Sequence, residues 1–100
     1  MKDESHRIDI IPEFQDPLAF DVLVHEGKSQ SRHRVTLSST EAARFSFAPP
    51  ARVIEASMKF LLDREPKESI LDAFDIGVIR RYFPEYDRVM PDYLASLSGR

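Results

Sequence analysis

The residues best suited to metal binding or proton transfer in this chain are its three histidines, His6, His25 and His33. A metal site or a proton relay needs two or three such rings to converge on one face. Alternating patterns place His25 and His33 on opposite faces of a predicted hairpin, and His6 precedes the first predicted strand. We therefore expect no metal site. His33 should complete an apolar sheet face near its edge, with the polar tip of its ring in water.

A second candidate for chemistry is the charged segment FLLDREPKESIL at positions 60–71. Its carboxylates, those of Asp63, Glu65 and Glu68, could in principle supply acid–base catalysis. Pro66, however, disfavours helical geometry in the residue before it and suits the first turn of a following helix. The segment is therefore predicted to be a joint between two helices, with its charges in solvent.

Motifs for nucleophilic or nucleotide-dependent catalysis do not occur in the sequence. Serines are frequent, but none lies in a G-x-S-x-G turn, and the three scattered glycines form no phosphate-binding loop. Without cysteine the chain has no disulfide, no thiol chemistry and no cysteine-ligated zinc. We expect a non-catalytic protein that uses no cofactor.

A β-hairpin is predicted over residues 20–37. AFDVLVHE and SRHRVTLS both alternate between apolar and polar residues, and GKSQ lies between them. The preferred register pairs Phe20 with Leu37 and Val22 with Val35, because a one-residue slip would move an apolar set to the wrong face. The hairpin is the expected centre of a small antiparallel sheet.

A possible third strand covers residues 7–11, where HRIDII alternates. It should stop at Pro12, because proline cannot donate to a strand ladder, and PEFQDP should form a loop.

Helices are predicted for the rest of the chain. Ser38 and Glu41 have capping-box spacing before a short helix. ARVIEASMKFLLDRE has a 3.6-residue apolar period, which predicts the main helix over 50–64. SILDAF, IGVIRRYF and the stretch that ends before Pro91 predict shorter C-terminal helices. The expected fold class is α+β, with the helices covering one face of the sheet.

The outer face of the hairpin carries a cluster of basic side chains in a chain whose net charge is −3: His25, Lys28, Arg32 and Arg34. Such a patch could meet phosphate or an acidic partner. Lysine and arginine on an exposed strand also discourage edge-to-edge pairing, and this explanation needs no partner. The patch is thus a candidate anion or nucleic-acid site, or edge protection.

Residues 69–83 offer a second nucleic-acid hypothesis. Ala73 and Gly77 lie between two short apolar segments, as in a helix-turn-helix, with Arg80 and Arg81 on the second helix. The mildly acidic chain and the need to bury apolar residues favour a core role instead. A nucleic-acid-binding regulator is therefore the alternative function.

The aromatic segment near the C-terminus is the strongest pointer to a partner surface. Tyrosine and methionine are enriched at protein interfaces, although a small domain also needs its aromatic residues for its core. The candidate interface residues are Tyr82, Phe83, Tyr86, Met90 and Tyr93.

The bulk properties fit a single domain over 1–100, with mobile ends at 1–6 and 95–100. No apolar stretch approaches the roughly 20 residues of a membrane span, and the opening residues are charged, so we expect no membrane contact and a cytoplasmic location.

The hairpin sequence FDVLVHEGKSQSRHRVTLS and the run FLLDREPKESILDAFDIGVIRRYFPEY together resemble a group of short bacterial proteins of unknown function. The resemblance covers roughly residues 20–90 and implies a small stand-alone bacterial protein. We therefore predict a non-catalytic interaction module that acts through a homodimer or a protein partner, using a sheet edge or the aromatic segment.

Overall fold

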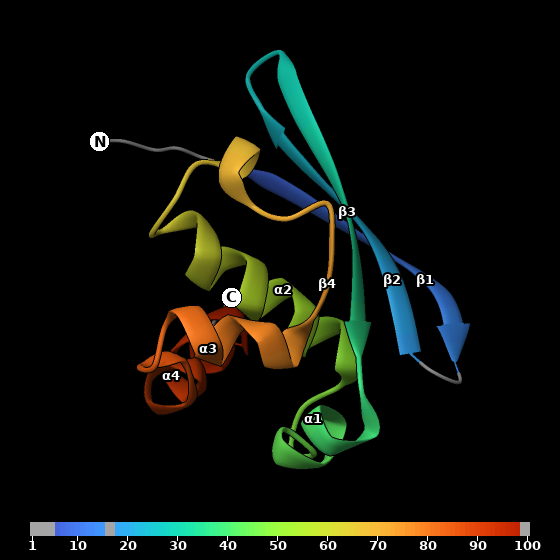
Figure 1. The fold of residues 1–100 in the computed structure, drawn as a ribbon, viewed down its shortest axis with the longest axis vertical. Coiled ribbons are helices and arrows are strands. Elements are labelled where there is room, and N and C mark those ends of the chain that lie inside the picture. The colour runs from blue at the N-terminus through green and yellow to red at the C-terminus, as the bar shows by residue number, and fades with distance from the viewer. Residues whose placement is uncertain (1–5, 16–17, 99–100) are drawn as a thin grey trace.

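The computed structural model describes residues 6–15 and 18–98, and its elements are shown in Figure 1. The strands are β1 Arg7–Gln15, β2 Leu18–Glu26, β3 Ser29–Leu37 and β4 Ala73–Asp75. The α-helices are α1 Ser39–Arg44, α2 Pro50–Leu62, α3 Ile79–Tyr82 and α4 Tyr86–Ser98, and the 3-10 helices are η1 Lys67–Ser69 and η2 Ile76–Val78.

The fold class is α+β, as predicted, but the sheet is larger than expected. Within the described residues it has four strands in the order β1-β2-β3-β4. The pairs β1–β2 and β2–β3 are antiparallel, whereas β4 lies parallel to β3. The helices cover one face of the sheet, and no helix of the described residues lies on the other face (Figure 1).

The β2–β3 hairpin is present, but its register differs from the predicted one. Phe20 pairs with Val35 rather than with Leu37, and Val22 pairs with His33. The chain reverses through a two-residue turn in which Gly27 has a φ of 60°, where a type II′ hairpin turn places its glycine. Because the pairing shifts by two residues, each side chain keeps its predicted face.

Strand β1 continues past Pro12 to Gln15, so the predicted end of the strand is wrong, and so is the predicted loop PEFQDP over residues 12–15. Residues 16–17 of that predicted loop lie outside the described part of the chain. Pro12 is tolerated because β1 is an edge strand, which pairs with β2 alone among the strands of the described ranges. The register shifts between Pro12 and Phe14, which identifies a β-bulge at Glu13.

Helix α2 confirms the predicted main helix, although it ends at Leu62 rather than at 64. Pro50 occupies its first turn, where the missing amide hydrogen costs nothing. The buried residues of α2 share one core with the inner faces of β2 and β3. Helix α4 packs against α2 on the side away from the sheet, so α2 is the central layer (Figure 1).

The segment SILDAF is not a helix, and this corrects the prediction. Residues 73–75 instead form β4 beside residues 34–36 of β3. Asp75 then accepts hydrogen bonds from the hydroxyl of Thr36 at 2.7 Å and from the amide of Gly77 at 3.0 Å. The pairing with β3 and the hydrogen bond from Thr36 outweigh the weak local preference of a short apolar run, which cannot by itself distinguish strand from helix.

Helix α4 also exceeds its prediction, because it contains Pro91 and reaches Ser98, within the segment predicted to be mobile. Burial of Met90, Leu94 and Leu97 on one face of the helix explains why it continues past the proline. The other predicted mobile residues, 1–5 and 99–100, lie outside the described part. Within the described residues, no helix has the length and apolar character needed to cross a membrane.

Candidate functional site

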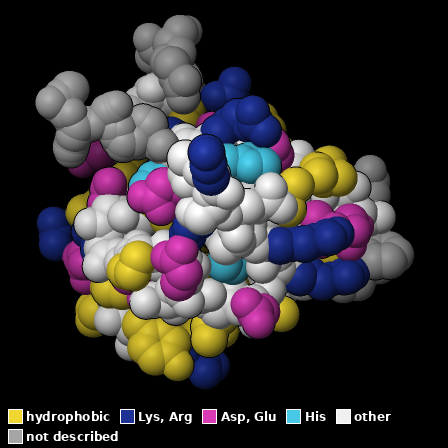
Figure 2. Space-filling model, turned by 90° about the horizontal axis from the view of Figure 1, so that it is seen from above, with side chains coloured by type: hydrophobic (Ala, Val, Ile, Leu, Met, Phe, Trp, Pro, Cys, Tyr) yellow, Lys and Arg dark blue, Asp and Glu magenta, His cyan; other side chains and the backbone are white. Residues whose placement is uncertain are grey.

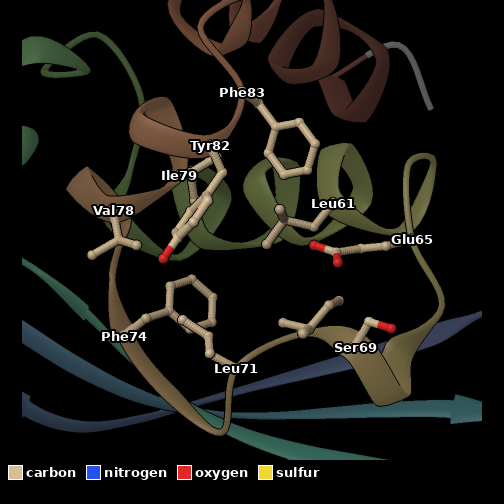
Figure 3. Close-up of a pocket in the computed structure, with 10 residues that line it drawn as sticks. Leu61, Glu65, Ser69, Leu71, Phe74, Val78, Ile79, Tyr82 and Phe83 are labelled. Atoms are coloured by element: carbon tan, nitrogen blue, oxygen red, sulfur yellow. The ribbon is translucent and has the colours of Figure 1, made fainter.

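The candidate site is an apolar pocket at the junction of α2, the η1–β4 segment and α3 (Figure 3). Its volume is about 290 Å³. Its lining residues are predominantly aliphatic or aromatic: Leu61, Glu65, Ser69, Ile70, Leu71, Phe74, Val78, Ile79, Tyr82 and Phe83.

The floor of the pocket is held in place by β3. The ring of His33 donates a hydrogen bond from Nδ1 to the carbonyl oxygen of Leu71 at 2.8 Å, since a carbonyl can only accept. The amide of Arg34 donates to the carbonyl of Asp72 at 2.7 Å. With its backbone tied to the sheet, the Leu71 side chain remains 52% exposed at the edge of the pocket.

Two features give the pocket the character of a binding site. Leu71 and Tyr82, which is 69% exposed, are large hydrophobic side chains left in solvent beside it. Among the described residues, Glu65 is its only charged lining residue, and Figure 3 shows its carboxylate pointing into the ring of apolar side chains. No hydrogen bond or ion pair joins that carboxylate to any residue in the described ranges.

The charged segment 60–71 is a connection between α2 and the next elements, as predicted, but its charges are not all in solvent. Lys67 is 1% exposed, and its ammonium group forms ion pairs with Glu68 and, at 3.5 Å, with Glu26 of the hairpin. The hydrogen bond with Glu68 raises the pKa of Lys67. The predicted solvated turn is therefore wrong for Lys67, which attaches η1 to the tip of the hairpin.

The structure divides the five predicted interface residues between core and surface. Tyr86 and Met90 are fully buried, and the Tyr86 hydroxyl lies 2.6 Å from Ser57 Oγ in the core. Burial raises the pKa of Tyr86. Phe83 and Tyr93 are half-buried, and Tyr82 is exposed. An interface stays a prediction here, and its accessible part is Tyr82 with Phe83, which both line the pocket.

The predicted basic patch does lie on the outer sheet face, but acidic side chains accompany it. His25 Nε2 is 2.9 Å from Asp9, and Arg32 donates to Asp21 at 2.7 Å. Lys28 is exposed in the hairpin turn. In Figure 2, Lys and Arg side chains lie beside Asp and Glu side chains on the face in view.

Arg34 on the same face pairs with Glu13 of the bulge at 3.2 Å. Glu13 and Asp21 also interact: the hydrogen bond from Arg32 lowers the pKa of Asp21, whereas the hydrogen bond with Asp21 raises the pKa of Glu13. A phosphate backbone would be repelled by these carboxylates. Nucleic-acid binding by the basic patch stays a prediction.

His25 and His33 point to opposite faces of the sheet, as predicted. His33, however, is 1% exposed, so its expected contact with water is wrong. Its Nε2 lies 2.8 Å from the hydroxyl of Ser31, and its Nδ1 is hydrogen-bonded to the carbonyl of Leu71. Within residues 6–15 and 18–98, no group of three or more His, Cys, Asp or Glu side chains is arranged to hold a metal ion.

The helix-turn-helix hypothesis for 69–83 is not supported by the fold of that segment, because Ala73 lies in a strand. Arg80, which would face DNA under that hypothesis, pairs with the buried Glu41 and with Asp87. Ser38 caps α1 as predicted, accepting a hydrogen bond from the amide of Glu41 at 3.3 Å. The Glu41 carboxylate binds Arg80 instead of completing the capping box.

A second hollow of about 280 Å³ lies between the loop before α2 and the middle of α4. Phe47 at its edge is 68% exposed, and Arg52 is the only charged lining residue within the described part of the chain. We take the first pocket as the candidate site because it combines exposed apolar side chains with a carboxylate directed inward.

Sequence reasoning missed Leu71, Phe74 and Glu65 as site residues. Leu71 and Phe74 lie in a segment that the sequence predicts to be helical, and Glu65 lies in the predicted solvated joint. The available signal was the pair of apolar residues Ile70 and Leu71 directly after a charged run. Which of the two is buried and which is exposed depends on the pairing of β4 with β3: Ile70 enters the core, and Leu71 is left exposed. Comparison with protein-family models, with curated proteins and with solved structures gave no match to this chain.

Proposed function

We propose that this protein is a non-catalytic interaction module of the cytoplasm that binds a short segment of a protein partner in the pocket between α2, β4 and α3. The observation that supports the proposal most directly is the exposure of Leu71 and Tyr82 beside an apolar cavity. Large hydrophobic side chains held in water next to a concave apolar surface are typical of interaction sites.

The size of the pocket favours a short segment. Ligand pockets commonly measure about 300–1,000 Å³, and this one, at about 290 Å³, has room for one or two side chains. A stable homodimer instead buries about 800 Å² on each partner. In the described part of the chain the other large exposed hydrophobic residues, Ile11 and Phe47, belong to other surfaces. A peptide therefore fits better than a second copy of the chain.

Panning of a random peptide library against the immobilised protein tests the proposal. We expect the enriched peptides to share an apolar side chain and to lose at least about tenfold in affinity for a Leu71→Asp variant, because an anchoring apolar contact is commonly a hot spot. Phe47→Asp is the matched control, since it places the same charge on another exposed hydrophobic residue, at the second hollow.

Two results would contradict the proposal. If the enriched peptides bind the Leu71→Asp variant as tightly as they bind the original chain, the pocket is not the site that recognises them. A concentration-dependent dimer in sedimentation that Leu71→Asp dissociates would identify a second copy as the occupant.

A further inference from the structure

We infer that the segment bound in this pocket carries a lysine or arginine beside its apolar side chain, and that Glu65 pairs with that cation. The inference rests on the proposed function, and it names the chemistry of the partner. Its basis is that the pocket has an apolar wall and that the charged carboxylate of Glu65 is directed into it (Figure 3).

The carboxylates closest to Glu65 along the chain already have partners. Asp63 accepts a hydrogen bond from the hydroxyl of Tyr93, and Glu68 pairs with Lys67. Glu65 differs from both, because in the described ranges nothing is bonded to its carboxylate. A half-buried carboxylate against apolar side chains is poorly solvated, so a docking cation would recover that cost.

The cation directly before Glu65 in the sequence, Arg64, also has partners already. Arg64 donates to Glu85 at 3.0 Å and to the backbone carbonyl of Phe60 at 3.1 Å, and its guanidinium group lies 3.7 Å from the centre of the Phe60 ring. Arg64 is therefore held on the α4 side of α2 and does not neutralise Glu65. In the part of the chain that the structure describes, no lysine or arginine lines the pocket.

The aromatic lining supports the same choice of ligand. Phe74, Tyr82 and Phe83 surround the pocket, and aromatic faces attract ammonium and guanidinium groups. An anionic ligand would instead meet the Glu65 carboxylate in surroundings of reduced dielectric constant, where like charges repel more strongly than in water. A segment with neighbouring apolar and cationic side chains can contact the apolar lining with the first and pair with the Glu65 carboxylate through the second.

Three related probes isolate the charge: phenylbutylamine, phenylbutanol and phenylbutyrate share an apolar body and differ in the terminal group. We expect methyl resonances of Leu61, Val78 and Ile79 to shift on titration. The amine should bind about threefold to tenfold more tightly than the alcohol, in the range of partly exposed charge pairs, and the acid most weakly. Added salt should reduce the preference.

Variants assign the preference to one residue. Glu65→Gln should make the amine and the alcohol bind equally while leaving alcohol binding unchanged. Asp72→Asn is the matched control: Asp72 is an exposed carboxylate next to Leu71 that does not line the pocket, so this variant should keep the preference. Equal binding of amine and alcohol by the original chain would overturn the inference and leave the apolar pocket intact. An equal loss in both variants would also overturn it.

Two capped dipeptides, acetyl-Phe-Lys-amide and acetyl-Lys-Phe-amide, separate a protein segment from a small amine. At least one of them should bind more tightly than phenylbutylamine and should compete with it. Weaker binding of both peptides would identify a small cationic ligand as the occupant, against the inference. If no probe shifts the pocket resonances, the proposed function fails together with the inference.

Discussion

Arg80 of α3 binds the buried carboxylate of Glu41 in α1 through two parallel hydrogen bonds, one of them 2.9 Å long between Nη2 and Oε1. The same guanidinium group donates to Asp87 of α4 at 2.7 and 2.9 Å. These hydrogen bonds raise the pKa of Arg80 and lower that of Asp87. One side chain therefore connects α3 and the neighbouring α4 to α1, which lies 39 positions earlier in the chain.

Replacement of Arg80 by alanine should lower the free energy of unfolding by about 2–4 kcal/mol, because it leaves the Glu41 carboxylate buried with only the more distant Arg44. Urea denaturation measures the loss. Arg81→Ala is the control, and it should change stability by less than about 0.5 kcal/mol because Arg81 is exposed. Equal effects of the two variants would show that the Arg80 contacts contribute nothing specific.

Gly77→Ala should destabilise the same region by about 1–2 kcal/mol, as in other overpacked sites. A Cβ at this position would lie 3.1 Å from Glu41 Oε2 and 3.3 Å from Asp75 Oδ2. Neither oxygen can move freely, because Arg80 binds the first and the amide of Gly77 binds the second. Thermal unfolding tests the prediction, and an unchanged or higher melting temperature would contradict it.

Tyr86→Phe should cost about 1–2 kcal/mol near neutral pH, because Ser57 loses its buried partner. At alkaline pH the two proteins should also differ in how steeply the free energy of unfolding falls. Burial raises the pKa of Tyr86 above its ordinary value of 10.0. The stabilisation that comes from burying the protonated Tyr86 hydroxyl is therefore complete below pH 10. It declines above pH 10 by about 1.4 kcal/mol per pH unit.

Unfolding measured between pH 9 and pH 11.5, a window set by that ordinary value of 10.0, should thus show a shallower alkaline decline for Tyr86→Phe than for the original chain. Tyr82→Phe, at an exposed position, should reproduce the original decline. Identical slopes for all three proteins would mean that Tyr86 ionises as readily in the folded state as in the unfolded one.

His33→Leu should lower the free energy of unfolding by about 1–3 kcal/mol, because the Leu71 carbonyl loses its donor. The substitution should also weaken the binding of apolar probes, since that hydrogen bond positions Leu71 at the pocket. His25→Gln, on the outer face, should cost less. A greater loss from His25→Gln than from His33→Leu would reverse the roles assigned to the two rings.

The elements that could be predicted are those whose evidence is local. Alternation over 20–37 identified the two faces of the hairpin, and the two-residue shift in register preserved them. The 3.6-residue period identified α2, and Ser38 identified the start of α1. Each of these depends on neighbours within a few residues, which the sequence displays directly.

The elements that escaped prediction depend on distant partners. The residues of the Glu41–Arg80 pair are separated by 39 positions in the chain, and those of the His33–Leu71 hydrogen bond by 38. An apolar period shows that a segment has a face to bury, but it does not show what will cover that face. The burial of Lys67 and the length of α4 also depend on contacts with distant parts of the chain.

Composition and periodicity alone therefore established an α+β chain with one amphipathic helix, an alternating hairpin and few features that indicate catalysis. The pairing of residues 73–75 with β3 then placed Leu71 and Phe74 beside α2 and α3, and so formed the pocket. That pairing follows from hydrogen-bonding groups that the edge of β3 must satisfy, a requirement that exists only once the sheet has formed.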